Sequence, residues 1–325
     1  MTSKKIVILG TGGTIAGTAA SAGDHLAYQA AQLGVDQLVA AVPQLAQVPL
    51  AAEQVAQLDS KDMDAATWQR LAARCAHHLA DEAVQGLVIT HGTDTLEETA
   101  YVLHRLLAPR KPVVLTCAMR PATALAADGP QNLLDAVTVA RASDAQGVLA
   151  VCAGRVHGPL EVAKVHPYRL DPFCSGEAGP VALVEDGRLR RLRPWPAAEA
   201  DADRALTDVV ARTAPSDWPW VEIVMNHAGA DGRAVAAVVE AGVQGLVVAG
   251  TGNGTVSASL EQALLAAQVR GVAVWRSTRC PLGQVLPHPG DRLPEAGGLS
   301  PVKARIALIL DRLQGAPAAV AKGSR

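Results

Sequence analysis

Aromatic residues and metal-binding patterns are scarce in this sequence. Aromatic side chains make up only 3% of the 325 residues, so aliphatic packing must fill the core. The nine histidines include no H-E-x-x-H pair, and the five cysteines are odd in number and include no C-x-x-C pair. The sequence therefore predicts no disulfide framework, no metal site and no cofactor.

An excess of charge and a long hydrophobic run are also missing. The formal net charge of −2 gives no field that would attract nucleic acid or an anionic membrane. No run approaches the ~18 apolar residues of a membrane-spanning helix. The apolar run after Lys5 is also shorter than the roughly 7–15 residues of a secretory signal. We therefore expect a cytoplasmic protein whose partners are small molecules or further copies of itself, with no nucleic-acid or membrane partner.

Length and patterning predict two α/β domains. A chain of 325 residues exceeds the roughly 250–300 residues at which a single core stops growing. Short apolar runs alternate with helix-period segments, which is typical of βαβ units and a mostly parallel sheet. Charges and prolines interrupt both periods between residues 185 and 219. We predict a larger N-terminal catalytic domain with a mostly parallel sheet at 1–187, a connection at 188–219, and a smaller C-terminal α/β domain at 220–325.

Two turns rich in glycine and threonine follow strand-like runs. The first spans 10–17 and carries Thr14, and the second spans 90–99 and carries Thr93. Ligands of parallel α/β sheets bind beyond the carboxyl ends of the strands, so both turns would face a crevice. Ile15 stands where a dinucleotide-binding motif needs its third glycine, which argues against that function. The second turn, taken alone, is equally well explained as a capping box that begins a helix.

A threonine in each turn indicates one reactive site. Threonine oxygen is a weak nucleophile and needs a base or a cation nearby to remove its proton. Candidates for that role are Tyr28, Asp94 and Lys164. Each of them also has a plainer interpretation, as a loop residue, a helix cap or a surface lysine.

The two turns resemble the two signature segments of the bacterial-type asparaginases and glutaminase-asparaginases. Nearly the whole chain shares the likeness, since it extends to residues 41–45, 59–63, 118–121, 127–133, 250–254 and 303–305. The resemblance implies an L-asparaginase that hydrolyses L-asparagine to L-aspartate and ammonia through a threonine nucleophile and an acyl-enzyme. Glutaminase side activity is a second expectation.

The resemblance also assigns roles to individual residues. Thr14 is the nucleophile, and Tyr28 lies on a mobile loop that closes over it. Thr93, Asp94 and Lys164 form a second group, which polarises the attacking water or the nucleophile. Backbone N–H groups near Thr93 would face the developing oxyanion.

Substrate binding and assembly are implied in the same way. Ser60 binds the α-carboxylate of the substrate and Asp94 its α-ammonium. The implied assembly is a homotetramer, a dimer of dimers, in which Asn253 reaches the neighbouring site; whether Asp291 or Glu295 also reaches it is left open. The full set of expected substrate-binding residues is Asp59, Ser60, Gly92, Asp94 and Asn253.

Lys61 departs from the family pattern, because relatives often carry an amide or an acid there. At ~6 Å from the substrate ammonium, a lysine would cost ~3 kcal/mol of repulsion at an effective dielectric of about 20. We therefore expect the Lys61 ammonium to turn outward or to pair with an acid.

Two other functions compete with this interpretation. The first is an ammonia-producing subunit of a tRNA-dependent amidotransferase, which carries an extra domain ahead of the catalytic one; a first strand near residue 5 and the absence of a basic patch disfavour it. The second is a non-catalytic α/β module that binds a small molecule and uses the threonine turns only as caps. The joint presence of the five expected catalytic residues disfavours this second alternative.

Overall fold

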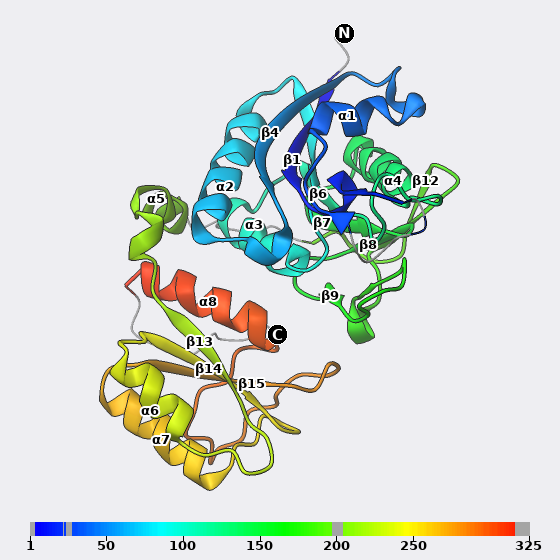
Figure 1. Cartoon of the computed structure of the whole chain (residues 1–325). Coiled ribbons are helices and arrows are strands. Elements are labelled where there is room, and N and C mark those ends of the chain that lie inside the picture. Colours follow the sequence, from blue (N-terminus) through cyan, green and yellow to red (C-terminus); the bar gives the residue numbers. More distant parts are fainter. Residues whose placement is uncertain (1–3, 22, 24–27, 197–203, 316–325) are drawn as a thin grey trace. The chain divides into compact units, whose positions relative to one another are not determined.

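The computed structural model describes residues 4–21, 23, 28–196 and 204–315 (Figure 1). The chain divides into two compact units, Met1–Arg204 and Ala205–Arg325, each with its own sheet. Their boundary falls inside the segment 188–219, for which the sequence predicts the connection. Among the described residues, no helix has the length and apolar character needed to cross a bilayer.

The sheet of the first unit has eight strands in the order β12-β11-β8-β7-β6-β5-β1-β4. The five strands from β7 to β4 pair in parallel, and the three at the other edge are joined by antiparallel pairing. This arrangement confirms the expected mostly parallel sheet. The strands are β1 (Lys5–Gly12), β4 (Leu50–Leu58), β5 (Val84–Thr90), β6 (Pro112–Thr116), β7 (Gly147–Cys152), β8 (Arg155–His157), β11 (Ala182–Glu185) and β12 (Arg188–Arg191).

Helices cover both faces of this sheet, as the continuous apolar runs of its central strands require. Ile6 and Ile8 of β1 belong to one core cluster with the apolar side chains of α1 and α4. Helices α2 and α3 pack against each other and against strands of the same sheet (Figure 1). The bounds are α1 (Val35–Ala40), α2 (Ala65–Ala80), α3 (Leu96–Leu107) and α4 (Gly129–Arg141).

Short elements complete the first unit; η2 precedes β4, whereas most of the others lie around the carboxyl ends of the parallel strands. Two antiparallel pairs of strands are formed there, β2 with β3 and β9 with β10. Single turns of 3-10 helix follow β1 and β4. The bounds are β2 (Thr18–Ala19), β3 (Tyr28–Gln29), β9 (Ala163–Lys164), β10 (Phe173–Cys174), η1 (Thr14–Ala16), η2 (Pro43–Leu45), η3 (Ser60–Asp62) and η4 (Gly176–Ala178).

The second unit is a smaller α/β domain, as expected. Its three strands pair in parallel in the order β13-β14-β15. Helices α6 and α7 pack on one face and α8 on the other (Figure 1). The bounds are β13 (Val221–Met225), β14 (Gly245–Gly250), β15 (Ala273–Thr278), α6 (Arg233–Glu240), α7 (Ala258–Val269) and α8 (Pro301–Leu313), with α5 (Arg204–Arg212) and η5 (Pro215–Asp217) preceding them.

Candidate active site

The two threonine-bearing turns touch each other at the carboxyl ends of β1 and β5. These strands are parallel neighbours, with Gly10 opposite Thr90. A Cβ on Gly13 would lie 2.4 Å from Gly92 Cα, so glycine alone permits this approach. Gly13 also has φ +80°, a left-handed conformation that favours glycine. The glycines of the motif therefore bring the two turns together, as the sequence predicts for a single site.

Thr14 begins η1, immediately after the first turn. Its side chain is largely buried, and its Oγ1 lies 2.6 Å from the Oη of Tyr28. Tyr28 is placed by the pairing of β2 with β3, opposite Ala19. The structure therefore brings these two expected catalytic residues into hydrogen-bond contact. Of the loop expected to close over the site, residues 22 and 24–27 lie outside the described part of the chain.

Lys164, Thr93 and Asp94 form the second group. Lys164 Nζ donates to Thr93 Oγ1 over 2.7 Å and to Asp94 Oδ1 over 2.5 Å. The Lys164 side chain is only 16% exposed, whereas that of Asp94 is 53% exposed. Lys164 reaches the turn from β9, where it pairs with Phe173 of β10. Its burial beside a carboxylate argues against the plainer interpretation as a surface lysine.

Ser60 is buried against the second turn. Its Oγ accepts a hydrogen bond from Asp94 N over 3.2 Å, and its carbonyl oxygen accepts one from Thr95 Oγ1 over 2.7 Å. A Cβ on Gly92 would lie 2.4 Å from Ser60 Oγ, so Gly92 makes room for that hydroxyl. Three of the residues expected to bind substrate, Ser60, Gly92 and Asp94, therefore lie together.

Lys61 and Asp59 form an ion pair at the edge of this group. Lys61 Nζ donates to Asp59 Oδ2 over 2.8 Å, and the Lys61 side chain is 65% exposed. The hydrogen bond to Asp59 raises the pKa of Lys61 above its usual value. The expectation that the lysine pairs with an acid is confirmed. One consequence is that both carboxylate oxygens of Asp59, an expected substrate-binding residue, already accept hydrogen bonds, Oδ2 from Lys61 Nζ and Oδ1 from Lys61 N over 3.4 Å.

The remaining expected residues lie in the second unit and have partners there. Asn253 Nδ2 donates to Leu286 O over 2.9 Å, and Leu286 N donates to Asn253 Oδ1 over 2.7 Å. A hydrogen bond from His288 N is the main cause of the lowered pKa of Asp291, and the ion pair of Asp291 with Arg276 lowers this pKa as well. Glu295 accepts a hydrogen bond from Gly297 N.

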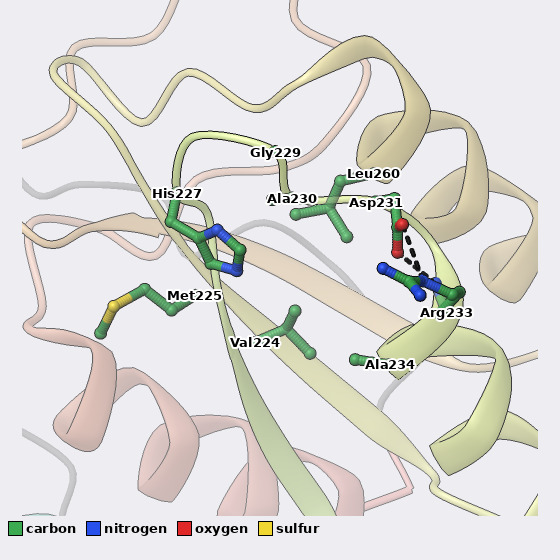
Figure 2. A pocket seen from close by; sticks show the side chains of 9 residues that line it. All are labelled: Val224, Met225, His227, Gly229, Ala230, Asp231, Arg233, Ala234 and Leu260. Carbon is green, nitrogen blue, oxygen red and sulfur yellow. Dashed lines mark hydrogen bonds and ion pairs between the residues drawn. The ribbon is translucent and has the colours of Figure 1, made fainter.

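A hollow of about 340 Å³ lies in the second unit, beyond the end of β13 (Figure 2). Met225 and Leu260 contribute apolar surface to it. Its charged residues neutralise each other, because Arg233 Nε donates to Asp231 Oδ2 over 2.8 Å. It contains none of the residues expected to act in catalysis. Among the described residues, no group of three His, Cys, Asp or Glu side chains is arranged to hold a metal ion.

His91 is a buried residue of the second turn that is not among the residues expected at the site. Its ring is fully buried and hydrogen-bonded at both nitrogens. The sequence does contain a signal for it, since His91 lies between the buried run of β5 and Gly92. A histidine in that position needs partners for both ring nitrogens.

Comparisons with known proteins cover both units. A family model described as Asparaginase, N-terminal matches residues 5–197, and one described as Glutaminase/Asparaginase C-terminal domain matches residues 220–318. The chain is 39% identical to L-asparaginase 2 of Escherichia coli (strain K12) over 313 residues, which are 94% of this chain and 88% of that protein. It is 37% identical to the glutaminase-asparaginase of Pseudomonas fluorescens biotype A over 310 residues, 93% of this chain and 84% of that protein.

A solved structure is similar over almost the whole chain. It is the crystal structure of a probable cytoplasmic L-asparaginase from Campylobacter jejuni, with a TM-score of 0.87 and 34% sequence identity. The match covers 96% of this chain and 98% of that one.

Proposed function

The chain belongs to the asparaginase family, as its two turns predict, and on that premise we propose that it is an L-asparaginase. It hydrolyses the side-chain amide of L-asparagine and releases L-aspartate and ammonia. One observation carries this proposal. The five side chains expected to act in catalysis form two hydrogen-bonded groups where the two turns touch: Thr14, Thr93 and Asp94 belong to the turns, and Tyr28 and Lys164 reach them from β3 and β9.

Thr14 is the nucleophile in this proposal. Its Oγ1 attacks the amide carbon of the substrate while its proton passes to Tyr28 Oη, 2.6 Å away, and Tyr28 hands its own hydroxyl proton on to the leaving nitrogen. The C–N bond then breaks, and the leaving nitrogen takes up a proton as ammonia. The product of this step is an aspartyl ester on Thr14.

The group of Thr93, Asp94 and Lys164 supports hydrolysis of that ester. Thr93 Oγ1 orients the attacking water, and Lys164 holds this hydroxyl from 2.7 Å. The carboxylate of Asp94 keeps the ammonium of Lys164 in place over 2.5 Å. Water adds to the ester and gives up a proton, the bond to Thr14 Oγ1 breaks, Thr14 Oγ1 takes up that proton, and L-aspartate leaves.

Substrate is bound by the residues gathered around the second turn. Ser60 binds the α-carboxylate, and Asp94 binds the α-ammonium with the help of Gly92 and Asp59. The pairing of Lys61 with Asp59 offsets the charge of this cation near the substrate ammonium. Glutamine is a slower second substrate, since one methylene changes binding by only about 1–3 kcal/mol.

The active assembly is a homotetramer, a dimer of dimers, in which Asn253 contributes to the site of a neighbouring subunit. For this role the amide of Asn253 must exchange its hydrogen bonds to Leu286 for a contact with the substrate or its binding residues. Light scattering checks the assembly: the mass of a monomer, accompanied by full activity, would refute it.

The direct test is ammonia release by the purified protein supplied with L-asparagine. We expect turnover from the parent protein and its loss in Thr14→Ala, with the thermal unfolding of the two proteins matched. Binding of asparagine without release would instead favour a small-molecule-binding module. Release that requires an aminoacyl-tRNA and a partner protein would favour an amidotransferase subunit.

A further inference from the structure

A buried chain of hydrogen bonds runs from helix α2 to the second turn. Trp68 Nε1 of α2 donates to Thr99 Oγ1 of α3 over 2.9 Å. Thr99 Oγ1 lies 2.9 Å from His91 Nε2, and His91 Nδ1 lies 2.7 Å from the carbonyl oxygen of Gly92. Trp68 is 6% exposed, and Thr99 and His91 are 0% exposed. The chain therefore connects the helical layer to the peptide bond between Gly92 and Thr93.

Each proton in this chain can be assigned. A carbonyl oxygen only accepts hydrogen bonds, so His91 Nδ1 must carry a proton and donate it to Gly92 O. Burial lowers the pKa of His91 to about 4, so the ring is neutral and its Nε2 carries no proton. Nε2 consequently accepts the hydroxyl proton of Thr99. Thr99 is free to donate it because its oxygen accepts the indole N–H of Trp68.

This bond also fixes the orientation of the next N–H group. In a trans peptide the carbonyl oxygen and the following N–H point in opposite directions. Because Gly92 O points at the buried ring of His91, the N–H of Thr93 points to the other side of the peptide. The same residue carries the hydroxyl that Lys164 contacts, so its backbone belongs to the candidate site.

We propose that His91 is a positioning residue, whose Nδ1–H holds the Gly92–Thr93 peptide so that Thr93 N–H faces the oxyanion formed at the substrate amide. The inference rests on the proposed function and deepens it. An N–H aimed at the developing oxyanion stabilises the transition state more than the bound substrate. If the Thr93 N–H loses this orientation, kcat therefore falls and KM stays nearly unchanged.

Two amide substitutions separate positioning from packing. In His91→Asn the side-chain nitrogen can occupy the place of Nδ1 and still donate to Gly92 O. In His91→Gln the nitrogen lies nearer the place of Nε2, and the carbonyl loses its donor. We expect kcat of His91→Asn to remain within about twofold of the parent value and kcat of His91→Gln to fall by roughly five- to tenfold, with KM of both variants within about twofold.

The same measurements can overturn the inference. Equal kcat values for the two variants, or a change confined to KM, would show that His91 only fills space. Thermal unfolding of each variant shows whether the fold is retained.

The tautomer of His91 can be measured without an activity assay. Nitrogen-15 NMR of histidine-labelled parent protein should show His91 protonated at Nδ1 near neutral pH, and protonation at Nε2 would refute the assignment. If the parent protein releases no ammonia from asparagine, the proposed function fails, while the NMR spectrum still decides the orientation of His91.

Discussion

Lys164 has two contacts at the candidate site and little exposure to solvent. Its ammonium is held by Asp94 and contacts the hydroxyl of Thr93. Lys164→Met keeps much of the apolar stem but removes the charge. We expect kcat to fall by at least about 100-fold, the usual scale for the loss of a group that stabilises developing charge. Steady-state kinetics at constant ionic strength measures the loss, and activity within tenfold of the parent value would show that the second group is misassigned.

Lys61 is the matched control, because it is a lysine close to the same turn with an exposed side chain. Its ammonium already pairs with Asp59. We expect Lys61→Gln to change KM for asparagine by less than about tenfold, the change that ~1.4 kcal/mol would produce. A decrease in KM approaching a hundredfold would show that Lys61 faces the substrate ammonium.

Single residues of the site are predictable where a motif surrounds them. Thr14 and Thr93 follow from the glycine turns and the strand ends that carry them. Lys164 stands in no local motif, and only the family likeness indicates it. Its burial depends on the pairing of β9 with β10, a tertiary contact that no local pattern encodes. Charge arguments predict only that the Lys61 ammonium turns outward or pairs with an acid. Which acid it contacts depends on distances in the folded chain, and the structure shows that it is Asp59.

At the level of the turns, Gly92 lies so close to Ser60 that any side chain at this position would clash with the Ser60 hydroxyl. Its φ is not in the left-handed region, so the effect of a side chain is one of space alone: a Cβ would lie 2.4 Å from Ser60 Oγ. We expect Gly92→Ala to displace the turn and to lower kcat/KM for asparagine by at least about tenfold, since small misplacements of a site are costly. Gly34→Ala is the control, because a Cβ there meets its nearest atom at 3.8 Å. Similar kinetics for the two variants would contradict the close packing of the turns.

Edge strand β4 and helix α2 are joined by an ionic cluster. Arg74 donates to both oxygens of Glu53 over 2.5 and 2.9 Å, and His78 Nε2 lies 2.7 Å from the same carboxylate. The hydrogen bond from Arg74 is the main cause of the lowered pKa of Glu53, about 2 in place of 4.5. A lowered pKa in the folded state gives stability that is present above the unfolded value and lost as the pH falls through the folded one.

The pH dependence of Glu53→Gln tests this cluster. At pH 7 we expect the free energy of unfolding to fall by about 1 kcal/mol, because solvent screens a partly exposed pair. The difference from the parent should shrink as the pH falls from 4.5 toward 2. Glu185→Gln removes a similar but more exposed pair with Arg190 and should cost less. Denaturant titrations at several pH values measure both; a constant difference for Glu53→Gln would contradict the account.

The hydrophobic pattern of the sequence predicts the central strands of the sheet but not its edge strand β12. Strands β1, β5, β6 and β7 are continuous apolar runs that need cover on both faces. The charges of strand β12 predict part of the connection at 188–219, yet this strand pairs with β11 through a two-residue turn at Asp186 and Gly187. Both turn residues have positive φ, which is typical of the Asp-Gly hairpin. Charge on an edge strand also protects it from unwanted pairing, so polarity there does not argue against a strand.

For the whole molecule, chain length and the alternation of strands and helices are sufficient to predict two α/β units. The boundary at Arg204 depends on which segments pack with which core, a property of the folded chain. The proposed role of Asn253 is the hardest to predict from sequence, because the structure shows its amide bonded to Leu286 within the second unit. A contribution to another subunit's site depends on assembly and not on local pattern.

The central claim for the whole enzyme is that turnover passes through an ester on Thr14. The most direct measurement is mass spectrometry of enzyme that is mixed with L-asparagine, quenched in acid within the first turnover and digested. The account predicts an aspartyl adduct on Thr14 of the parent protein and none in Thr14→Ala. An adduct on Thr93, or on any other residue in place of Thr14, would contradict it.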